Sequence, residues 1–158
     1  MNRTGYATLL LCLALVACGG SGPVRRVSEP AASIQQLTVR ADGSWSVDLR
    51  INNYSTVPMR FDTVSLAVAM GGEPAGNLQG APAITVGPES ADVATLQMSP
   101  AAGARVRIAD ALASRHSVAY AFSGTISAAA TDGGGARDYD LERSSALSPV
   151  PGLPGVLR

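Results

Sequence analysis

Alternation of apolar and polar residues with a period of two is the feature that most constrains how this chain can fold. Apolar residues occupy every odd position from Trp45 to Ile51, and polar residues occupy the positions between them. Because successive side chains of a strand point to opposite faces, this segment is predicted to be a strand with one face in a core and one in water. Residues 118–128 repeat the pattern. The two segments favour a layered β protein.

Weaker patterns extend the prediction to about seven strands. Residues 34–40 are joined to the Trp45 strand by a turn with Asp42 and Gly43 at its centre, which predicts a hairpin. Between residues 57 and 70 the apolar positions change from odd to even near Asp62 and Thr63. One extra residue must therefore bulge there if both halves face the core. Further candidate strands cover residues 74–78, 84–86, 91–98 and 139–141.

One helix is expected between Ser99 and Ala113. Ser99 is a good N-cap, and Pro100 suits the first helical position, where its missing N–H costs nothing. Apolar residues recur at helical spacing through the alanine-rich stretch that follows. About seven strands and one short α-helix predict a mainly all-β fold, a β-sandwich. Four aromatic residues are expected in its core: Trp45, Phe61, Tyr120 and Phe122.

Residues 1–17 are typical of a secretory signal peptide. A short start with one positive charge precedes an apolar stretch of about a dozen residues, and small residues follow it. The stretch is too short for a membrane-spanning helix, which needs about 20 apolar residues.

The end of this segment resembles the lipobox of bacterial lipoproteins, which consists here of Leu15, Val16, Ala17 and Cys18. The resemblance implies cleavage before Cys18 and attachment of lipid to its thiol. A plain signal peptide with an incidental cysteine is the alternative. Gly19 stands where an aspartate would retain a lipoprotein at the inner membrane, so the resemblance implies the outer membrane of the bacterial cell envelope.

The mature chain is expected to have three parts. Residues 18–33 are rich in Gly, Ser and Pro and are predicted to be a lipidated flexible tether. Residues 34–146 form the predicted sandwich domain, and residues 147–158 form a proline-rich C-terminal tail. Cys12 leaves with the signal peptide and Cys18 takes the lipid, so no thiol remains for a disulfide, a metal site or a nucleophile.

The order of these elements resembles the WHy-domain (water stress and hypersensitive response) and late embryogenesis abundant type 2 proteins. Residues 48–53 stand at that family's strand and turn, and residues 64–72 at its long strand ending in glycine. Asn53 replaces the usual proline. The resemblance covers residues 33–145. It implies a fibronectin III or immunoglobulin-like β-sandwich without catalytic activity, associated with tolerance of desiccation. Bacterial members are commonly lipoproteins, which agrees with Cys18.

Little in the sequence predicts catalysis. His116 is the only histidine, no Gly-x-Ser-x-Gly motif is present, and His116 is expected to be exposed at the helix exit. Asp138, Asp140 and Glu142 share one face of a strand, where they could hold a divalent cation or form a solvated face that discourages aggregation. The solvated face is the preferred interpretation. We therefore expect no enzyme, catalytic residue, cofactor or metal.

Composition narrows the partners. The chain has 12 arginines, no lysine and 12 acidic residues, and this balance argues against nucleic-acid binding. Asn53 begins an Asn-Tyr-Ser glycosylation pattern, which a bacterial lipoprotein would rarely use. The first hypothesis is a lipid-anchored protective protein with non-specific stress clients and no small-molecule substrate. The alternative is an interaction module that docks an envelope protein through a sheet edge or the proline-rich tail.

Overall fold

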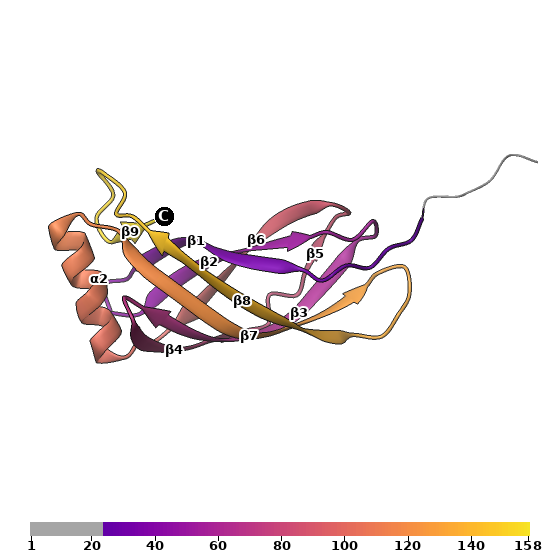
Figure 1. Ribbon diagram of the computed structural model, residues 1–158, viewed down its shortest axis with the longest axis horizontal. Coiled ribbons are helices and arrows are strands. Elements are labelled where there is room, and N and C mark those ends of the chain that lie inside the picture. The colour runs from indigo at the N-terminus through magenta and orange to yellow at the C-terminus, as the bar shows by residue number, and fades with distance from the viewer. Residues whose placement is uncertain (1–23) are drawn as a thin grey trace, which may run out of the picture.

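A computed structural model describes residues 24–158, in which two antiparallel sheets pack face to face as a β-sandwich (Figure 1). The all-β prediction is confirmed, with nine strands among these residues instead of about seven. The first sheet, here sheet A, has the order β6-β2-β1-β9. Its strands are β6 (Ser90–Met98), β2 (Trp45–Asn53), β1 (Ala31–Val39) and β9 (Val156–Leu157).

The second sheet, sheet B, has the order β4-β3-β7-β8, and a short strand β5 also pairs with β3. Its strands are β4 (Glu73–Gly80), β3 (Met59–Met70), β7 (Val118–Ala130), β8 (Arg137–Leu147) and β5 (Ile84–Val86). The expected hairpin around Asp42 and Gly43 is confirmed, because β1 pairs with β2 on either side of that turn. The expected bulge is also confirmed, since the register of β3 against β7 shifts between Phe61 and Thr63.

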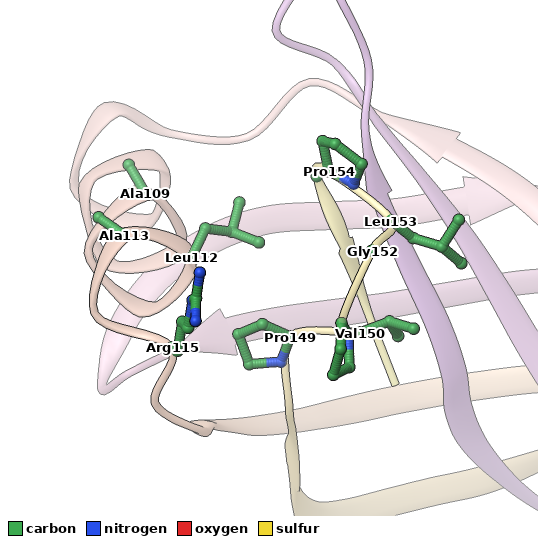
Figure 2. A pocket seen from close by; sticks show the side chains of 11 residues that line it. Ala109, Leu112, Ala113, Arg115, Pro149, Val150, Gly152, Leu153 and Pro154 are labelled. Carbon is green, nitrogen blue, oxygen red and sulfur yellow. The ribbon is translucent and has the colours of Figure 1, made fainter.

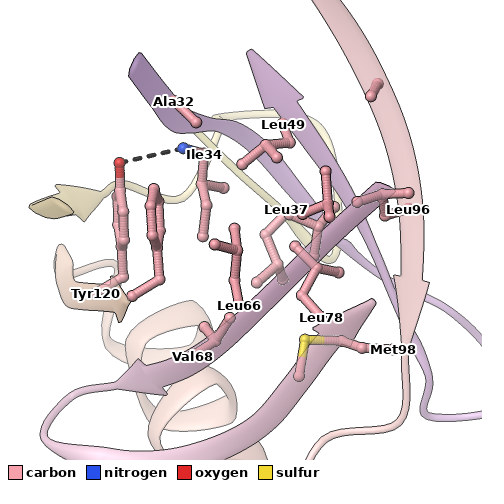
Figure 3. Packing of buried hydrophobic residues seen from close by; sticks show 14 of the residues in the cluster. Ala32, Ile34, Leu37, Leu49, Leu66, Val68, Leu78, Leu96, Met98 and Tyr120 are labelled. Atoms are coloured by element: carbon pink, nitrogen blue, oxygen red, sulfur yellow. Dashed lines mark hydrogen bonds between the residues drawn. The ribbon is translucent and has the colours of Figure 1, made fainter. Parts of the chain in front are cut away.

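The bulge has the effect that the alternation requires. Phe61 before it and Val64 after it are both buried, although the two positions have opposite parity. Without the extra residue, one half of β3 would point its apolar side chains into water. The core lies between the sheets (Figure 3), and all four aromatic residues expected there are buried. The backbone N–H of Ile34 in β1 donates to the hydroxyl of Tyr120 in β7 at 3.2 Å, which ties the two sheets together.

The expected helix is present as α2 (Ala102–Ser114), but the prediction of its N-terminus was wrong. Ala101 is the N-cap residue, and no side chain caps the helix. The backbone N–H of Ala101 donates to the carbonyl of Ala75 in β4 at 2.9 Å. This bond holds the chain extended beside β4, so Ser99 and Pro100 precede the helix instead of opening it.

The fold extends further at both ends than the sequence patterns indicated. Strand β1 begins at Ala31, inside the predicted tether, and residues 24–28 are hydrogen-bonded to loops of the domain. Within the predicted tail, β9 pairs with β1 at the edge of sheet A. Backbone bonds between Ser148 and Arg158 close the intervening loop. Period-two patterns did not reveal these segments because residues 24–28 form no strand, β9 has only two residues, and the start of β1 carries only Ala and Ser side chains.

The two ends of the sandwich are different. Residues 24–28 lie at one end, here the entry end, where Arg25 is hydrogen-bonded to Asp132 in the turn between β7 and β8 (Figure 1). Helix α2 and the C-terminal loop, residues 149–155, lie at the opposite end, here the far end. None of the helices within residues 24–158 is long and apolar enough to cross a membrane.

Candidate functional site

The predicted lipidation site lies outside the described residues. Leu15, Val16, Ala17 and Cys18 all precede residue 24, so the lipobox and its cleavage stay predictions.

His116 lies where the sequence placed it. It is exposed, and it follows Arg115, the left-handed residue that ends α2. The backbone N–H of His116 donates to the carbonyl of Ala111 at 3.1 Å, so this residue completes the end of the helix. Its position favours the predicted role at the helix exit.

The three acidic residues of β8 also share a face. Asp138, Asp140 and Glu142 are exposed, and they lie opposite Ser127, Thr125 and Ser123 of β7. Within residues 24–158, no group of three or more His, Cys, Asp or Glu side chains is placed to hold a metal ion.

This acidic row borders a broader surface, which we call the sheet B outer face. Its side chains are almost all short, with hydroxyl, methyl or amide groups, and they come from four adjacent strands. Besides the acidic row, its exposed members are Thr63, Ser65, Ala67, Asn77, Gln79, Ala119, Ala121, Ser123, Thr125, Ser144 and Ala146.

Asn53 is a buried polar centre that the sequence analysis missed. Its side chain is 1% exposed. Its amide nitrogen Nδ2 lies within hydrogen-bonding distance of three carbonyl oxygens, those of Val57 at 2.9 Å, Val86 at 3.1 Å and Gly87 at 2.9 Å. Its oxygen Oδ1 accepts the backbone N–H of Ser55 at 2.9 Å. Asn53 thus joins the end of β2 to the loop before β3 and to the end of β5.

One signal in the sequence marked this residue. The odd positions of β2 face the core, and Asn53 continues that series after Ile51. A polar residue on a core face needs internal hydrogen bonds, because its burial is otherwise costly. The same burial leaves the Asn-Tyr-Ser pattern without an accessible amide for glycosylation.

Residues 24–28 are bound across the entry end, and we call this segment the strap. Thr56 and Arg26 exchange backbone and side-chain bonds, since the hydroxyl of Thr56 accepts the N–H of Arg26 at 2.9 Å and the N–H of Thr56 donates to the carbonyl of Arg26 at 3.0 Å. The hydroxyl of Thr56 also lies 2.8 Å from the carbonyl oxygen of Val24. Further along, the N–H of Ser28 donates to the buried hydroxyl of Ser55 at 3.0 Å.

Ion pairs connect the strap to two other loops. The Arg25 guanidinium donates to both carboxylate oxygens of Asp132 at 3.1 Å and to the carbonyl of Gly133 at 2.6 Å. These hydrogen bonds lower the pKa of Asp132 and raise the pKa of Arg25. Arg26 lies 3.3 Å from a carboxylate oxygen of Glu89. Both pairs are exposed to solvent, so each adds little to the stability of the fold, and their main effect is to fix the position of the strap.

A groove of about 830 Å³ lies at the far end, between α2 and the C-terminal loop (Figure 2). Ala109, Leu112 and Ala113 form the helix side, and residues 149–155 form the other side. Arg115 is the one charged residue of its lining. Three lining residues are prolines, which offer carbonyl acceptors but no N–H donors. The sequence indicated the proline-rich segment but not its position against the helix.

Comparison with known proteins adds little to this description. No family model and no curated protein matches the sequence. A crystal structure of a protein from Archaeoglobus fulgidus is 14% identical, with a TM-score of 0.44, over 79% of this chain and 98% of that chain. The X-ray structure of Northeast Structural Genomics Consortium target SoR45 is also 14% identical, with a TM-score of 0.48, over 81% of this chain and 92% of that chain.

Proposed function

We propose that this protein is a non-enzymatic lipoprotein of the bacterial cell envelope, of the WHy and late embryogenesis abundant type 2 kind, that protects its neighbours during water loss. Anchoring through Cys18 is supported by the lipobox resemblance, and Gly19 supports placement in the outer membrane. The anchor itself would consist of acyl chains, in which each buried methylene contributes about 0.8 kcal/mol.

The observation that carries the protective role is the sheet B outer face. Its hydroxyl and amide groups are on short side chains spread over four adjacent strands. They can form hydrogen bonds with the surface of a drying neighbour in place of water, with little loss of side-chain entropy. The chain has no lysine, and the exposed part of β8 carries carboxylates that retain water strongly. Such a surface suits many clients and needs no specific partner.

A drying assay tests the proposal. The chain without its first 18 residues is mixed with a dehydration-sensitive enzyme, dried and rehydrated, and an equal mass of an unrelated folded β-sandwich serves as the control. We expect recovery of enzyme activity well above that control. The double variant Ser65→Lys with Ser123→Lys, which places long charged side chains on the sheet B outer face, is expected to lose most of the gain. The matched variant Gln35→Lys with Gln97→Lys changes exposed positions of sheet A and should keep it.

Recovery equal to that of the unrelated sandwich would refute direct protection. Equal recovery by the two lysine variants, with both above the control, would assign protection to the protein but not to this face.

A second function is favoured by the far-end groove, namely an interaction module for an envelope protein. Its lining is made of alanine, leucine, valine, proline and glycine with one arginine, so the occupant that fits is an apolar peptide segment. A photoreactive residue at Leu153, which is half exposed in that lining, should then capture one defined protein in intact cells. The same photoreactive residue at Thr125 is the control. Capture of the same proteins at both positions would exclude the groove as a specific site.

A further inference from the structure

The geometry points to a membrane-facing surface: the entry end of the sandwich, formed by the strap and the loop of residues 54–57, lies against the lipid headgroups, and the far end points away from the bilayer. This inference rests on the proposed lipid anchor at Cys18. Its partner is the phospholipid surface in which that anchor is embedded.

The first argument is the length of chain between the lipid and the fold. Only residues 19–23 separate Cys18 from Val24. Six residue steps at 3.3–3.6 Å each reach about 20 Å when fully extended. The strap shortens the connection that the sequence predicted, because residues 24–28 are fixed to the domain and cannot serve as slack. The entry end is therefore confined to the vicinity of the headgroups.

The second argument is the distribution of exposed apolar side chains. Five large hydrophobic residues are exposed within residues 24–158. Three of them are at the entry end: Val24 at 76%, Tyr54 at 53% and Val27 at 38%. Tyr54 is adjacent to the strap, because its carbonyl lies 3.3 Å from the Arg26 guanidinium. A tyrosine beside short apolar side chains suits the membrane–water interface, where its ring and hydroxyl are both accommodated.

The third argument concerns charge. The two arginines of the strap are each paired with a carboxylate, Arg25 with Asp132 and Arg26 with Glu89. The strap thus brings no unpaired positive charge to the surface. Attraction to anionic lipid is not the cause of the orientation, which follows from the short connection and the apolar side chains. We therefore expect the contact to form on zwitterionic lipid and to persist at high salt.

Depth-dependent fluorescence quenching tests this orientation. The full chain is produced in a bacterial host with lipoprotein processing, so that residues 1–17 are removed. It is then reconstituted into phosphatidylcholine vesicles that contain a headgroup-nitroxide lipid. Once Cys18 carries lipid, an introduced cysteine is the only thiol available for a fluorescent label. Labels are placed by Val24→Cys and Tyr54→Cys at the entry end and by Val106→Cys and Leu153→Cys at the far end.

The four positions form two matched pairs. Val24 and Val106 are 76% and 66% exposed, and Tyr54 and Leu153 are 53% and 49% exposed, so each pair differs mainly in its place in the fold. Strand β3 has 12 residues, and at about 3.4 Å per residue the two ends lie on the order of 40 Å apart. We expect severalfold stronger quenching at both entry-end labels than at their partners, with no change when salt is raised or anionic lipid is added.

Each other outcome has a defined meaning. If the protein floats with the vesicles and its N-terminal peptide has the mass of a lipidated Cys18, but the paired labels are quenched equally, anchoring stands and the orientation is wrong. Stronger quenching at the far end also overturns it. If Cys18 carries no lipid and the chain does not float, both the proposed anchor and this orientation are wrong. Because either entry-end label is sufficient, misfolding of one variant does not remove the test.

Discussion

Replacement of Asn53 by alanine should be among the most damaging single changes at the entry end. The substitution removes the contacts of Nδ2 with three carbonyl oxygens, which share its two hydrogens, and the hydrogen bond that Oδ1 accepts. It leaves the N–H of Ser55 and the carbonyls of Val57 and Val86 without these partners. All three of those residues are buried, so water has little access to the groups that are released.

The magnitude follows from the number of groups left unpaired. Each buried donor or acceptor without a partner costs about 1–3 kcal/mol. Three such groups at the low end of that range give a loss of about 3 kcal/mol in the free energy of unfolding, because the small void left by Asn53→Ala can admit some water. For a domain of this size, such a loss lowers the melting temperature by about 10 °C.

A carboxylate at the same place gives a sharper test. In Asn53→Asp, one oxygen can still accept the Ser55 N–H, but the other replaces a donor and faces the three carbonyl oxygens. Burial and these oxygens disfavour the charged form, so the pKa of the new carboxyl is raised above its unfolded value of about 3.9. The folded state then binds more protons than the unfolded state, and the stability of this variant falls as pH rises above about 4. At neutral pH it should be less stable than Asn53→Ala.

Urea unfolding followed by the fluorescence of Trp45 measures these changes, because Trp45 is the only tryptophan and is buried. The matched control is Asn52→Ala, which changes the neighbouring, half-buried asparagine and should alter stability by less than about 0.5 kcal/mol. A loss below about 1 kcal/mol for Asn53→Ala would refute the assignment of Asn53 as a buried hydrogen-bonding centre. So would an Asn53→Asp variant that is as stable at pH 7 as at pH 4.

Three further substitutions test other parts of the fold. Gly124→Ala should lower the free energy of unfolding, measured in urea, by more than about 3 kcal/mol, because the new Cβ would lie 2.1 Å from a backbone oxygen of β3. Its control is Gly133→Ala, which has open space around the new Cβ and should lose only about 1 kcal/mol through backbone strain. Tyr120→Phe should cost about 1–2 kcal/mol, since it leaves the N–H of Ile34 unpaired in the core, and a loss near zero would contradict that bond. Arg115→Gly should raise the melting temperature by a few degrees, because Arg115 has a left-handed conformation (φ 55°) that glycine adopts without strain; a decrease would contradict this reasoning.

The regular parts of this fold were predictable because they depend on short-range pattern. The alternation in β2 and β7, the turn at Asp42 and the bulge after Phe61 follow from side chains that lie within a few residues of each other. A bulge can be located from sequence because a change of parity leaves only one way to keep both halves buried.

The start of α2 shows where such reasoning ends. Ser99 and Pro100 form a good local signal for a helix N-terminus, but the bond from Ala101 to Ala75 joins residues 26 positions apart and fixes a later start. A local preference of about 1 kcal/mol is readily outweighed by a tertiary contact of this kind.

The strap could not be found from sequence for the same reason. The bond between Arg25 and Asp132 joins positions 107 residues apart, and no periodicity connects them. Glycine, serine and proline are common both in flexible linkers and in loops that are fixed by hydrogen bonds. Composition alone therefore could not distinguish the strap from a flexible tether.

This difference changes what the N-terminal segment can do. A flexible connection from Cys18 to residue 33 would let the domain turn freely above a membrane, and both ends of the sandwich would stay accessible. A strap that begins at Val24 leaves room for only one end of the sandwich near the proposed anchor at Cys18 and keeps α2 and the far-end groove remote from it. Under the proposed anchoring, the contacts of Thr56, Ser55 and Asp132 determine which surface of the sandwich is available to anything outside the bilayer.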